Sequence, residues 1–398
     1  MNILFITSRL PFPPYRGDKS RTFNLIKALS KDHRIVLVSF YENRQELIYK
    51  EKLMEYCTAV HLVYLPKWFS WAKAIILYFQ CDPSQSYYYW SYRMSNLISR
   101  ITRGEKFDIA YIHLFRMFNY AKSISPKVYI VTDLTDVVSK ELFRSIGFGH
   151  KWKDYFVKRE AVKIRNYERV VTENSDEVWV VSEQEKNDLM SATFKGNIHV
   201  VKIGVVANEI IRKPVDNTLL FFGYSSTGHN RDALIYLRKE ILPRLKNYIP
   251  DVVLNVFGAG KWQNRKIGKD EFPVVHYGFI KNPEDLFSKN LVMVAPIVYS
   301  AGTQTKILEA MNNGIPVVTS DFGNEGIGAI HEKQIIVCSS ADEYVTEIRR
   351  LLTDRIFNEY IGLNGQKYVR DNFSWDYVTE RASEIEKTLK SQNLKPVL

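Results

Sequence analysis

Short apolar runs alternate with segments of helical period along most of the chain. The runs of the first half are NILFIT, RIVLVSF, AVHLVYL, FDIAYIH, KVYIVTD and EVWVVS, and those of the second half are TLLFFG, VVLNVFG, VVHYG, LVMVAP and PVVTS. Runs of this length that are rich in β-branched residues are typical of buried strands. Strands that alternate with helices form parallel sheets, so the pattern predicts an α/β protein with two doubly wound, Rossmann-like domains.

The alternation is interrupted at residues 203–217, where IGVVANEIIRKPVDN combines a glycine, a proline and mixed polarity. We therefore expect a first domain at residues 1–203 and a second domain at residues 204–372. Residues 373–398 have helical period, and we expect them to form a closing helix that packs on the first domain.

Composition narrows the class of protein. The 398 residues are 45% hydrophobic and 25% charged, which is ordinary for globular domains. The three cysteines are far apart and form no CxxC pair, so they indicate neither a disulfide framework nor a zinc site and suit a reducing cytoplasm. The amino terminus lacks the regions of a signal peptide, so we expect no export. The run AKAIILYF at 72–79 is shorter than the roughly 20 residues that span a bilayer.

Basic residues are concentrated in the first half of the chain. The net charge is +11, and residues 1–205 hold 31 Lys and Arg against 21 Asp and Glu, whereas residues 206–398 hold 24 against 23. Such a surface favours anionic partners, namely nucleic acid, acidic lipid or a phosphorylated substrate. Nucleic acid is the weakest of these, because no recognised motif or array of aromatic and basic residues accompanies the charge.

Several well-known chemistries have no motif in this chain. It contains no GxGxxG after the first strand, no GxxxxGK[ST] phosphate loop, no HExxH and no GxSxG. No two aspartates are spaced i, i+2, so the Asp-x-Asp arrangement that many sugar-nucleotide enzymes use to bind a metal is also missing. We therefore expect neither a metal nor an organic cofactor.

A first candidate ligand loop follows the first strand and leads into a helix. Gly17 lies there beside Arg16, Lys19 and Arg21. A glycine lets the backbone approach a ligand closely, and free amides at a helix start attract anions such as phosphate. The alternative interpretation is an ordinary turn glycine after three prolines.

A second candidate loop, in SAGTQTKILEAMNNG, also joins an expected strand to a helix. Gly302, Thr303 and Gln304 open that helix, which carries Lys306 and Glu309 on one face. A carboxylate two turns into a sheet-facing helix can accept hydrogen bonds from both hydroxyls of a ribose. The alternatives are a solvated lysine and a surface carboxylate.

Three further polar residues follow expected strands of the first half. His113 ends FDIAYIH, where a lone histidine is more often structural than catalytic. Asp133 and Asp136 lie in VTDLTD, and helix N-capping is as good an explanation as chemistry for Asp136.

These motifs resemble family 4 of the GT-B glycosyltransferases. The run GTQTKILEAMNNGIPVVTSDFGNEGI resembles the family signature, and RLPFPPYRGDKSRTFNLIKAL, EVWVVSEQEK, LLFFGYSSTGHNRDAL, HYGFI and FSWDYV resemble further segments in the same order. Within the family the chain looks nearest to bacterial transferases of exopolysaccharides and cell-surface sugars. The resemblance implies two domains that face a central cleft, with an acceptor bound by the first and a nucleotide-sugar by the second, retention of the anomeric configuration, and no metal.

The resemblance also implies roles for individual residues. Glu309 matches the carboxylate that holds the ribose, and Thr303 with Gln304, next to Gly302, matches the helix start at the diphosphate. Gly17 matches the glycine that approaches the diphosphate from the other domain. The remaining two matches are less direct, and they place His113 near the transferring sugar and Phe279 near the base.

Two departures from the family pattern stand out. The usual first glutamate of the signature is replaced by Ala301, and the usual Arg and Lys after the first strand of the donor domain are not evident. Lys306 or Arg231 can supply that positive charge, and we favour Lys306. Together, Lys306, Glu309 and His113 are the predicted catalytic group.

The sequence predicts a retaining hexosyltransferase that uses a nucleotide-sugar donor, with UDP or GDP favoured, and a saccharide or polyprenyl-diphosphate-linked acceptor. Its alternatives are a non-hydrolysing sugar-nucleotide epimerase and a catalytically weak nucleotide-sugar-binding protein. We expect a cytoplasmic location. The segments LPKWFSWAKAIILYF and SYYYWSYRM suggest peripheral contact with an anionic membrane, and an interior helix followed by an ordinary aromatic cluster explains them equally well.

Overall fold

The structure is a computed structural model, and it divides the chain into two compact units. The first unit comprises Met1–Ile146, His150–Gly204 and Trp375–Leu398, and the second comprises Gly147–Gly149 and Val205–Ser374. The residues that the structure describes are 1–148, 151–191, 196–206, 210–224, 227–258, 273–280 and 283–393.

The first unit is built on a parallel sheet of seven strands in the order β3-β2-β1-β4-β5-β6-β7. These strands are β1 Asn2–Thr7, β2 Arg34–Tyr41, β3 Ala59–Tyr64, β4 Ile109–His113, β5 Tyr129–Thr135, β6 Glu177–Val180 and β7 Ile198–Val200. The chain builds outward from β1 to β3 and then returns to place β4 on the other side of β1. This reversal is where open α/β sheets bind ligands, at the carboxyl ends of the strands.

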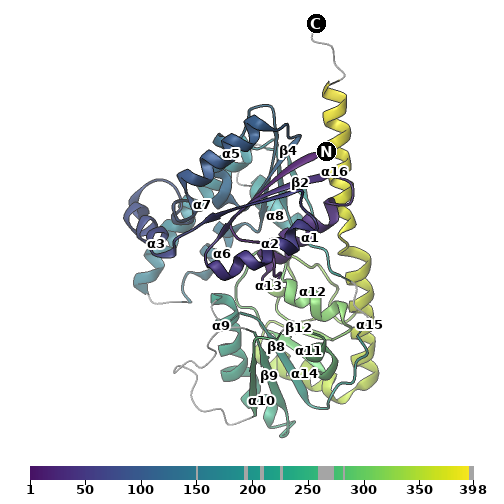
Figure 1. Ribbon diagram of the computed structural model, residues 1–398. Helices are drawn as coiled ribbons and strands as arrows, with labels where there is room; N and C mark the ends of the chain where they lie inside the picture. Colours follow the sequence, from purple (N-terminus) through teal and green to yellow (C-terminus); the bar gives the residue numbers. More distant parts are fainter. Residues whose placement is uncertain are drawn as a thin grey trace. The chain divides into compact units, whose positions relative to one another are not determined.

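Helices connect these strands (Figure 1). They are α1 Gly17–Leu29, α2 Lys50–Met54, α3 Lys67–Ile76, α4 Ser84–Tyr89, α5 Tyr92–Gly104, α6 Val138–Ser145, α7 Lys151–Asn174 and α8 Glu183–Ser191, with 3₁₀ turns η1 Arg44–Tyr49, η2 Leu77–Phe79 and η3 Phe115–Ser123. The central strands are buried on both faces: Leu4 and Ile6 belong to one apolar cluster, whereas Ile3 and Phe5 belong to another. Burial on both faces explains why these strands read as continuous apolar runs.

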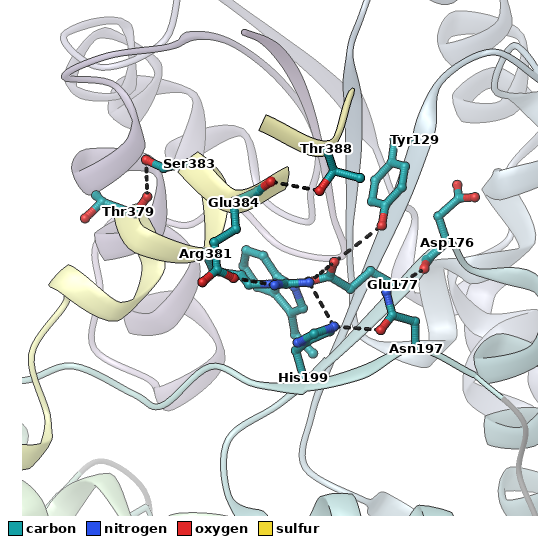
Figure 2. A network of polar contacts seen from close by, with 11 residues as sticks. Tyr129, Asp176, Glu177, Asn197, His199, Thr379, Arg381, Ser383, Glu384 and Thr388 are labelled. Atoms are coloured by element: carbon teal, nitrogen blue, oxygen red, sulfur yellow. Dashed lines mark hydrogen bonds and ion pairs between the residues drawn. The ribbon is translucent and has the colours of Figure 1, made fainter. Parts of the chain in front are cut away.

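The last helix, α16 Asp376–Asn393, belongs to the first unit and packs against α1 (Figure 1). Its Val378, Ala382 and Ile385 are buried in the cluster that contains Ile3 and Phe5. Figure 2 shows the polar part of the same contact, in which Arg381 of α16 reaches Glu177 at the start of β6. Both guanidinium-to-carboxylate distances are 2.6 Å, and the Glu177 side chain is fully buried. This bidentate ion pair fixes α16 to the first sheet.

The second unit has a parallel sheet of six strands in the order β10-β9-β8-β11-β12-β13. The strands are β8 Thr218–Phe222, β9 Val253–Phe257, β10 Val274–Gly278, β11 Val292–Ala295, β12 Val317–Thr319 and β13 Ile336–Val337. The helices are α9 Gly228–Tyr236, α10 Leu242–Lys246, α11 Pro283–Lys289, α12 Thr305–Asn312, α13 Asp321–Asn324, α14 Ala341–Thr353 and α15 Arg355–Asn372, with a π turn, η4 Leu237–Ile241. Here the reversal lies between β8 and β11.

The predicted α/β class with two doubly wound parallel sheets is confirmed, and each of the eleven quoted apolar runs contains a strand. Among the described residues, no helix is both long enough and apolar enough to cross a bilayer.

Candidate functional site

The loop between β11 and α12 lies at the reversal point of the second sheet. Gly302 has a φ of +70°, a left-handed conformation that suits glycine and turns the chain into α12. The N-cap residue is Gln304, and its own side chain forms no capping hydrogen bond. The first amides of a helix have no partner within the helix, so the start of α12 can receive an anion.

A second loop supports the first from the carboxyl end of β12. Thr303 Oγ1 donates to the carbonyl of Gly326 at 3.0 Å, and Ser300 Oγ donates to the carbonyl of Phe322 at 3.1 Å. A Cβ on Gly326 would lie 2.5 Å from the Gly302 carbonyl oxygen, so this contact requires a glycine. The glycines of the signature therefore hold the start of α12 in place.

Lys306 lies in the first turn of α12 and is 8% exposed, so the solvated interpretation of this residue is wrong. Its Nζ donates to Oδ1 of Asn230, which is on α9 and 6% exposed. Asn230 in turn donates from Nδ2 to the carbonyl of Tyr224 at 3.2 Å. The ammonium group is thus directed to the helix start that follows β8, on the other side of the reversal point.

Burial changes the protonation of both charged residues of α12. It lowers the pKa of Lys306 to about 7 and raises the pKa of Glu309 to about 7. Glu309 is half-buried one turn after Lys306, and its carboxylate forms no hydrogen bond or ion pair with any described residue. A lysine with an amide as partner and a carboxylate without one are groups that a ligand can still engage.

The neighbouring strand ends are shaped by glycine. A Cβ on Gly258, which follows β9 and has a φ of +127°, would lie 1.7 Å from the Gly223 carbonyl oxygen after β8. Phe279 follows β10 and is 44% exposed. Because β9 and β8 separate β10 from β11, Phe279 lies roughly 14 Å along the edge from α12. Ala301, the departure from the family signature, is buried beside Gly302.

The first unit brings Gly17 and His113 together through α1. Gly17 is the first residue of α1, which has no side-chain cap at Arg16. Thr22 on the same helix lies 3.3 Å from Nδ1 of His113, measured from its Oγ1. His113 is 2% exposed, and its Nε2 has no hydrogen-bond partner among the described residues. Burial lowers the pKa of His113 to about 4, so its imidazole is neutral at pH 7.

Charged residues surround these two positions. Asp18 lies 2.7 Å from Arg9, 3.6 Å from Arg16 and 3.7 Å from Arg116, each measured between charged atoms. Burial alone would raise the pKa of Asp18, but the three guanidinium groups outweigh it and hold that pKa well below its usual range. The cluster carries more positive than negative charge, as an anion site requires. Sequence reasoning missed Arg9, Arg116 and Asp18, although Arg9 and Asp18 lie in the quoted loop.

Three interpretations need correction. Arg21 does not join the cationic group around Gly17, because it is 1% exposed and pairs with Asp133 at 2.6 Å. Asp133 lies inside β5 and also accepts a hydrogen bond from Tyr111, so it caps no helix. Asp136 does not cap α6 either, since the N-cap residue is Val137 and the first-turn amide of Ser139 donates to Glu168 Oε1 at 3.1 Å. Asn230 was missed, and its place in the first turn after a strand at the reversal point was the signal that could have found it.

Comparison with known proteins identifies similar sequences and structures. Residues 216–354 match the family model for glycosyl transferases group 1. Poly(glycerol-phosphate) alpha-glucosyltransferase of Bacillus subtilis is 23% identical over 93% of this chain and 56% of its own length. An uncharacterized 44.6 kDa protein in the cps region of Klebsiella pneumoniae is 23% identical over 39% of this chain and 42% of its own length. The matches thus span less than two thirds of these curated relatives.

Solved structures show the same fold. HepE of Anabaena, solved with UDP-glucose, has a TM-score of 0.69 at 16% identity and covers 98% of this chain and 100% of its own. Sucrose-phosphate synthase of Thermosynechococcus elongatus has a TM-score of 0.70 at 15% identity, with coverage of 98% and 100%. TarM has a TM-score of 0.73 at 11% identity, with coverage of 96% and 98%. The chain therefore has the GT-B fold, and its residues 216–354 match the family model for glycosyl transferases group 1.

Proposed function

We propose that the protein is a retaining glycosyltransferase that moves a sugar from a nucleotide-sugar donor to a saccharide or lipid-linked acceptor of a bacterial surface polysaccharide. The observation that carries this proposal is the arrangement of α12. Lys306 is buried in its first turn, the N-cap side chain forms no capping hydrogen bond, and the Glu309 carboxylate one turn later has no partner within the part of the chain that the structure describes. Its second support is the match of residues 216–354 to the family model for glycosyl transferases group 1.

Lys306 and the start of α12 act on the diphosphate. When the glycosidic bond to the nucleotide breaks, negative charge grows on the departing nucleoside diphosphate. A fixed ammonium and the amides of a helix N-terminus stabilise such charge without reorganisation. In this proposal the transfer needs no metal, because these groups supply the positive charge. Retention of the anomeric configuration is inferred from the resemblance of the sequence to family 4 of the GT-B glycosyltransferases.

Glu309 holds the ribose. Its carboxylate can accept one hydrogen bond from each of two vicinal hydroxyls, and this contact is made equally in the bound donor and in the transition state. Glu309 therefore sets donor affinity rather than rate. We propose UDP as the first nucleotide to test, because HepE, which shares the fold, was solved with UDP-glucose.

The first unit binds the acceptor in this proposal. Its cationic cluster around Asp18 suits a phosphorylated or diphosphate-linked acceptor, and Gly17 offers a close backbone approach at the start of α1. The neutral His113 beside α1 is assigned to the transferring sugar, as the resemblance implies.

A thermal-shift screen against UDP, GDP, ADP and dTDP tests the proposal. A nucleotide at 100 times its dissociation constant adds about 2.7 kcal/mol of stability, so one or two of them should raise the melting temperature clearly. Glu309→Gln should weaken the binding of that nucleotide by about 1–3 kcal/mol, since a charged hydrogen-bond acceptor is lost. Glu343→Gln, on α14 of the same unit, is the matched control and should leave affinity unchanged.

The outcomes also separate the alternatives. Turnover of a donor without any acceptor would support the epimerase, and binding without turnover on any acceptor would support the binding protein. No stabilisation by any of the four nucleotides would contradict all three functions.

A further inference from the structure

An exposed apolar face runs along α3 and η2 in the first unit. Trp68, Trp71, Ile75, Ile76 and Phe79 are between 61% and 76% exposed. Spacings of three and four residues place Trp68, Trp71 and Ile75 along one side of α3. Their opposite side, with Ser70 and Ala74, is buried. Large apolar side chains grouped on a surface mark an interaction site.

The beginning of α7 continues this face. Trp152, Tyr155 and Phe156 are between 43% and 65% exposed. Tyr78 of η2 donates a hydrogen bond to the carbonyl of Phe156 at 3.1 Å, and the two rings lie 5.8 Å apart. Segments more than seventy residues apart in sequence therefore form one surface, here called the aromatic face, which comprises Trp68, Trp71, Ile75, Ile76, Phe79, Trp152, Tyr155 and Phe156.

Two basic residues of α7 connect it to η2 through hydrogen bonds. Arg159 Nη2 donates to the carbonyl of Phe79 at 3.2 Å, and its guanidinium lies 5.3 Å from the centre of the Phe79 ring. Lys163 donates to the carbonyl of Tyr78. The aromatic face thus has a defined shape built on two helices.

The charge around the aromatic face is almost entirely positive. Residues 67–79 contain two lysines and no acid, and residues 151–163 contain five Lys and Arg against two acids. Lys151, Lys153 and Lys158 are exposed and form no ion pair with any described residue. The Lys153 ammonium lies 5.3 Å from the Trp152 ring centre, so positive charge adjoins the apolar groups directly.

We propose that the aromatic face docks the first unit on an anionic membrane surface. Tryptophan and tyrosine favour the boundary between headgroups and acyl chains, isoleucine and phenylalanine enter the acyl region, and the lysines meet lipid phosphates. A second copy of the chain is a poor occupant, because a symmetric contact would set this positive surface against itself. The proposal goes beyond glycosyl transfer and does not depend on it.

The structure changes which segments take part. In the predicted segment SYYYWSYRM, Tyr89 and Met94 are 3% and 0% exposed and belong to the core, whereas Trp90 and Tyr92 are 37% and 73% exposed. The start of α7, which the sequence did not single out, adds three exposed aromatic side chains.

Vesicle flotation tests the proposal with two pairs of variants. The full chain should float with vesicles of phosphatidylglycerol and phosphatidylcholine, less so as salt rises, and should not float with pure phosphatidylcholine. Ile75→Glu with Ile76→Glu should lower the partition at least about tenfold. The matched control is Ile356→Glu with Leu363→Glu, which changes equally exposed side chains of the second unit and should have no effect.

Charge reversal tests the lysines separately. Lys151→Glu with Lys153→Glu and Lys158→Glu should lower the partition about tenfold or more, whereas the same reversal at Lys239, Lys333 and Lys367 of the second unit should lower it far less. Unchanged melting temperatures would show that every variant is folded. The proposal fails if the wild-type chain does not bind anionic vesicles, or if the test and control variants bind alike. It also fails if sedimentation shows self-association that the Ile75 and Ile76 changes abolish while vesicle binding persists.

Discussion

The carboxyl edges of the two sheets differ in how their charges are satisfied. In the first unit, Asp133 pairs with Arg21 and Asp18 pairs with Arg9, both within 2.7 Å. In the second unit, Lys306 has an amide oxygen as its partner, and Glu309 has no partner among the described residues. The buried Arg21–Asp133 pair of the first unit therefore contributes to structure, whereas the second unit keeps a buried lysine and a half-buried carboxylate for a ligand. The same topology thus supports one edge where a buried ion pair satisfies its own charges and one edge where a ligand would satisfy them.

The largest expected effect lies in the structural pairs of the first unit. Arg381→Met leaves the Glu177 carboxylate buried without its cation, and such a loss costs about 3–5 kcal/mol. Urea unfolding at pH 7 measures it, and nucleotide affinity should not change. Adding Glu177→Leu should restore much of the stability, and Lys52→Met, which removes an exposed pair, should leave it unchanged. A loss of nucleotide affinity in Arg381→Met at full stability would contradict the assignment of this pair to structure.

The next effect concerns catalysis in the second unit. Lys306→Met removes a positive charge from the developing diphosphate, and loss of one such contact lowers kcat about 10²–10³-fold, or roughly 2.7–4 kcal/mol. Stability should change little, because methionine has similar volume and needs no hydration. Once a donor and acceptor are known, steady-state kinetics measures the effect, with Lys333→Met as the exposed control. An unaltered kcat would mean that Lys306 has a structural role, like the ion pairs Arg381–Glu177 and Arg21–Asp133 of the first unit.

A smaller effect is a pH dependence of stability that His113 produces. Its pKa is about 4 in the folded protein and about 6.5 when unfolded, so between these values the unfolded chain binds the proton and the folded chain does not. Stability from this group is therefore lost as pH falls, by about 2 kcal/mol between pH 7 and pH 5. Urea unfolding should show that this slope is reduced in His113→Asn. Equal slopes of stability against pH in the two proteins would mean that His113 binds a proton in the folded protein as readily as in the unfolded chain.

Much of the fold could be predicted because parallel strands buried on both faces produce apolar runs that local sequence reveals. The run NILFIT, for example, coincides with β1. The strands β7 and β13 were not predicted, because they have only three and two residues, too few for a periodic pattern. Charged partners were harder still. Arg21 and Asp133 are 112 positions apart, and only the folded sheet shows that they pair and leave Arg21 unavailable to a ligand.

The candidate site was predictable where a motif reports local geometry. Gly302, Thr303 and Gln304 lie at a strand-to-helix turn, as the signature indicated. The burial of Lys306 and its bond to Asn230 depend on how α9 and α12 pack, and no spacing within the signature encodes this contact.

Proton uptake on nucleotide binding tests the central claim most directly. At pH 8 Lys306, with a pKa of about 7, is mostly neutral, whereas Glu309 is mostly ionised and contributes little. A diphosphate beside Lys306 raises its pKa, so binding should take up close to one proton. Calorimetry of the nucleotide selected by thermal shift, in two buffers of different ionisation enthalpy, measures the uptake. We predict close to one proton for the wild-type chain and none for Lys306→Met; equal uptake by both, or none by either, would contradict the placement of the diphosphate at Lys306.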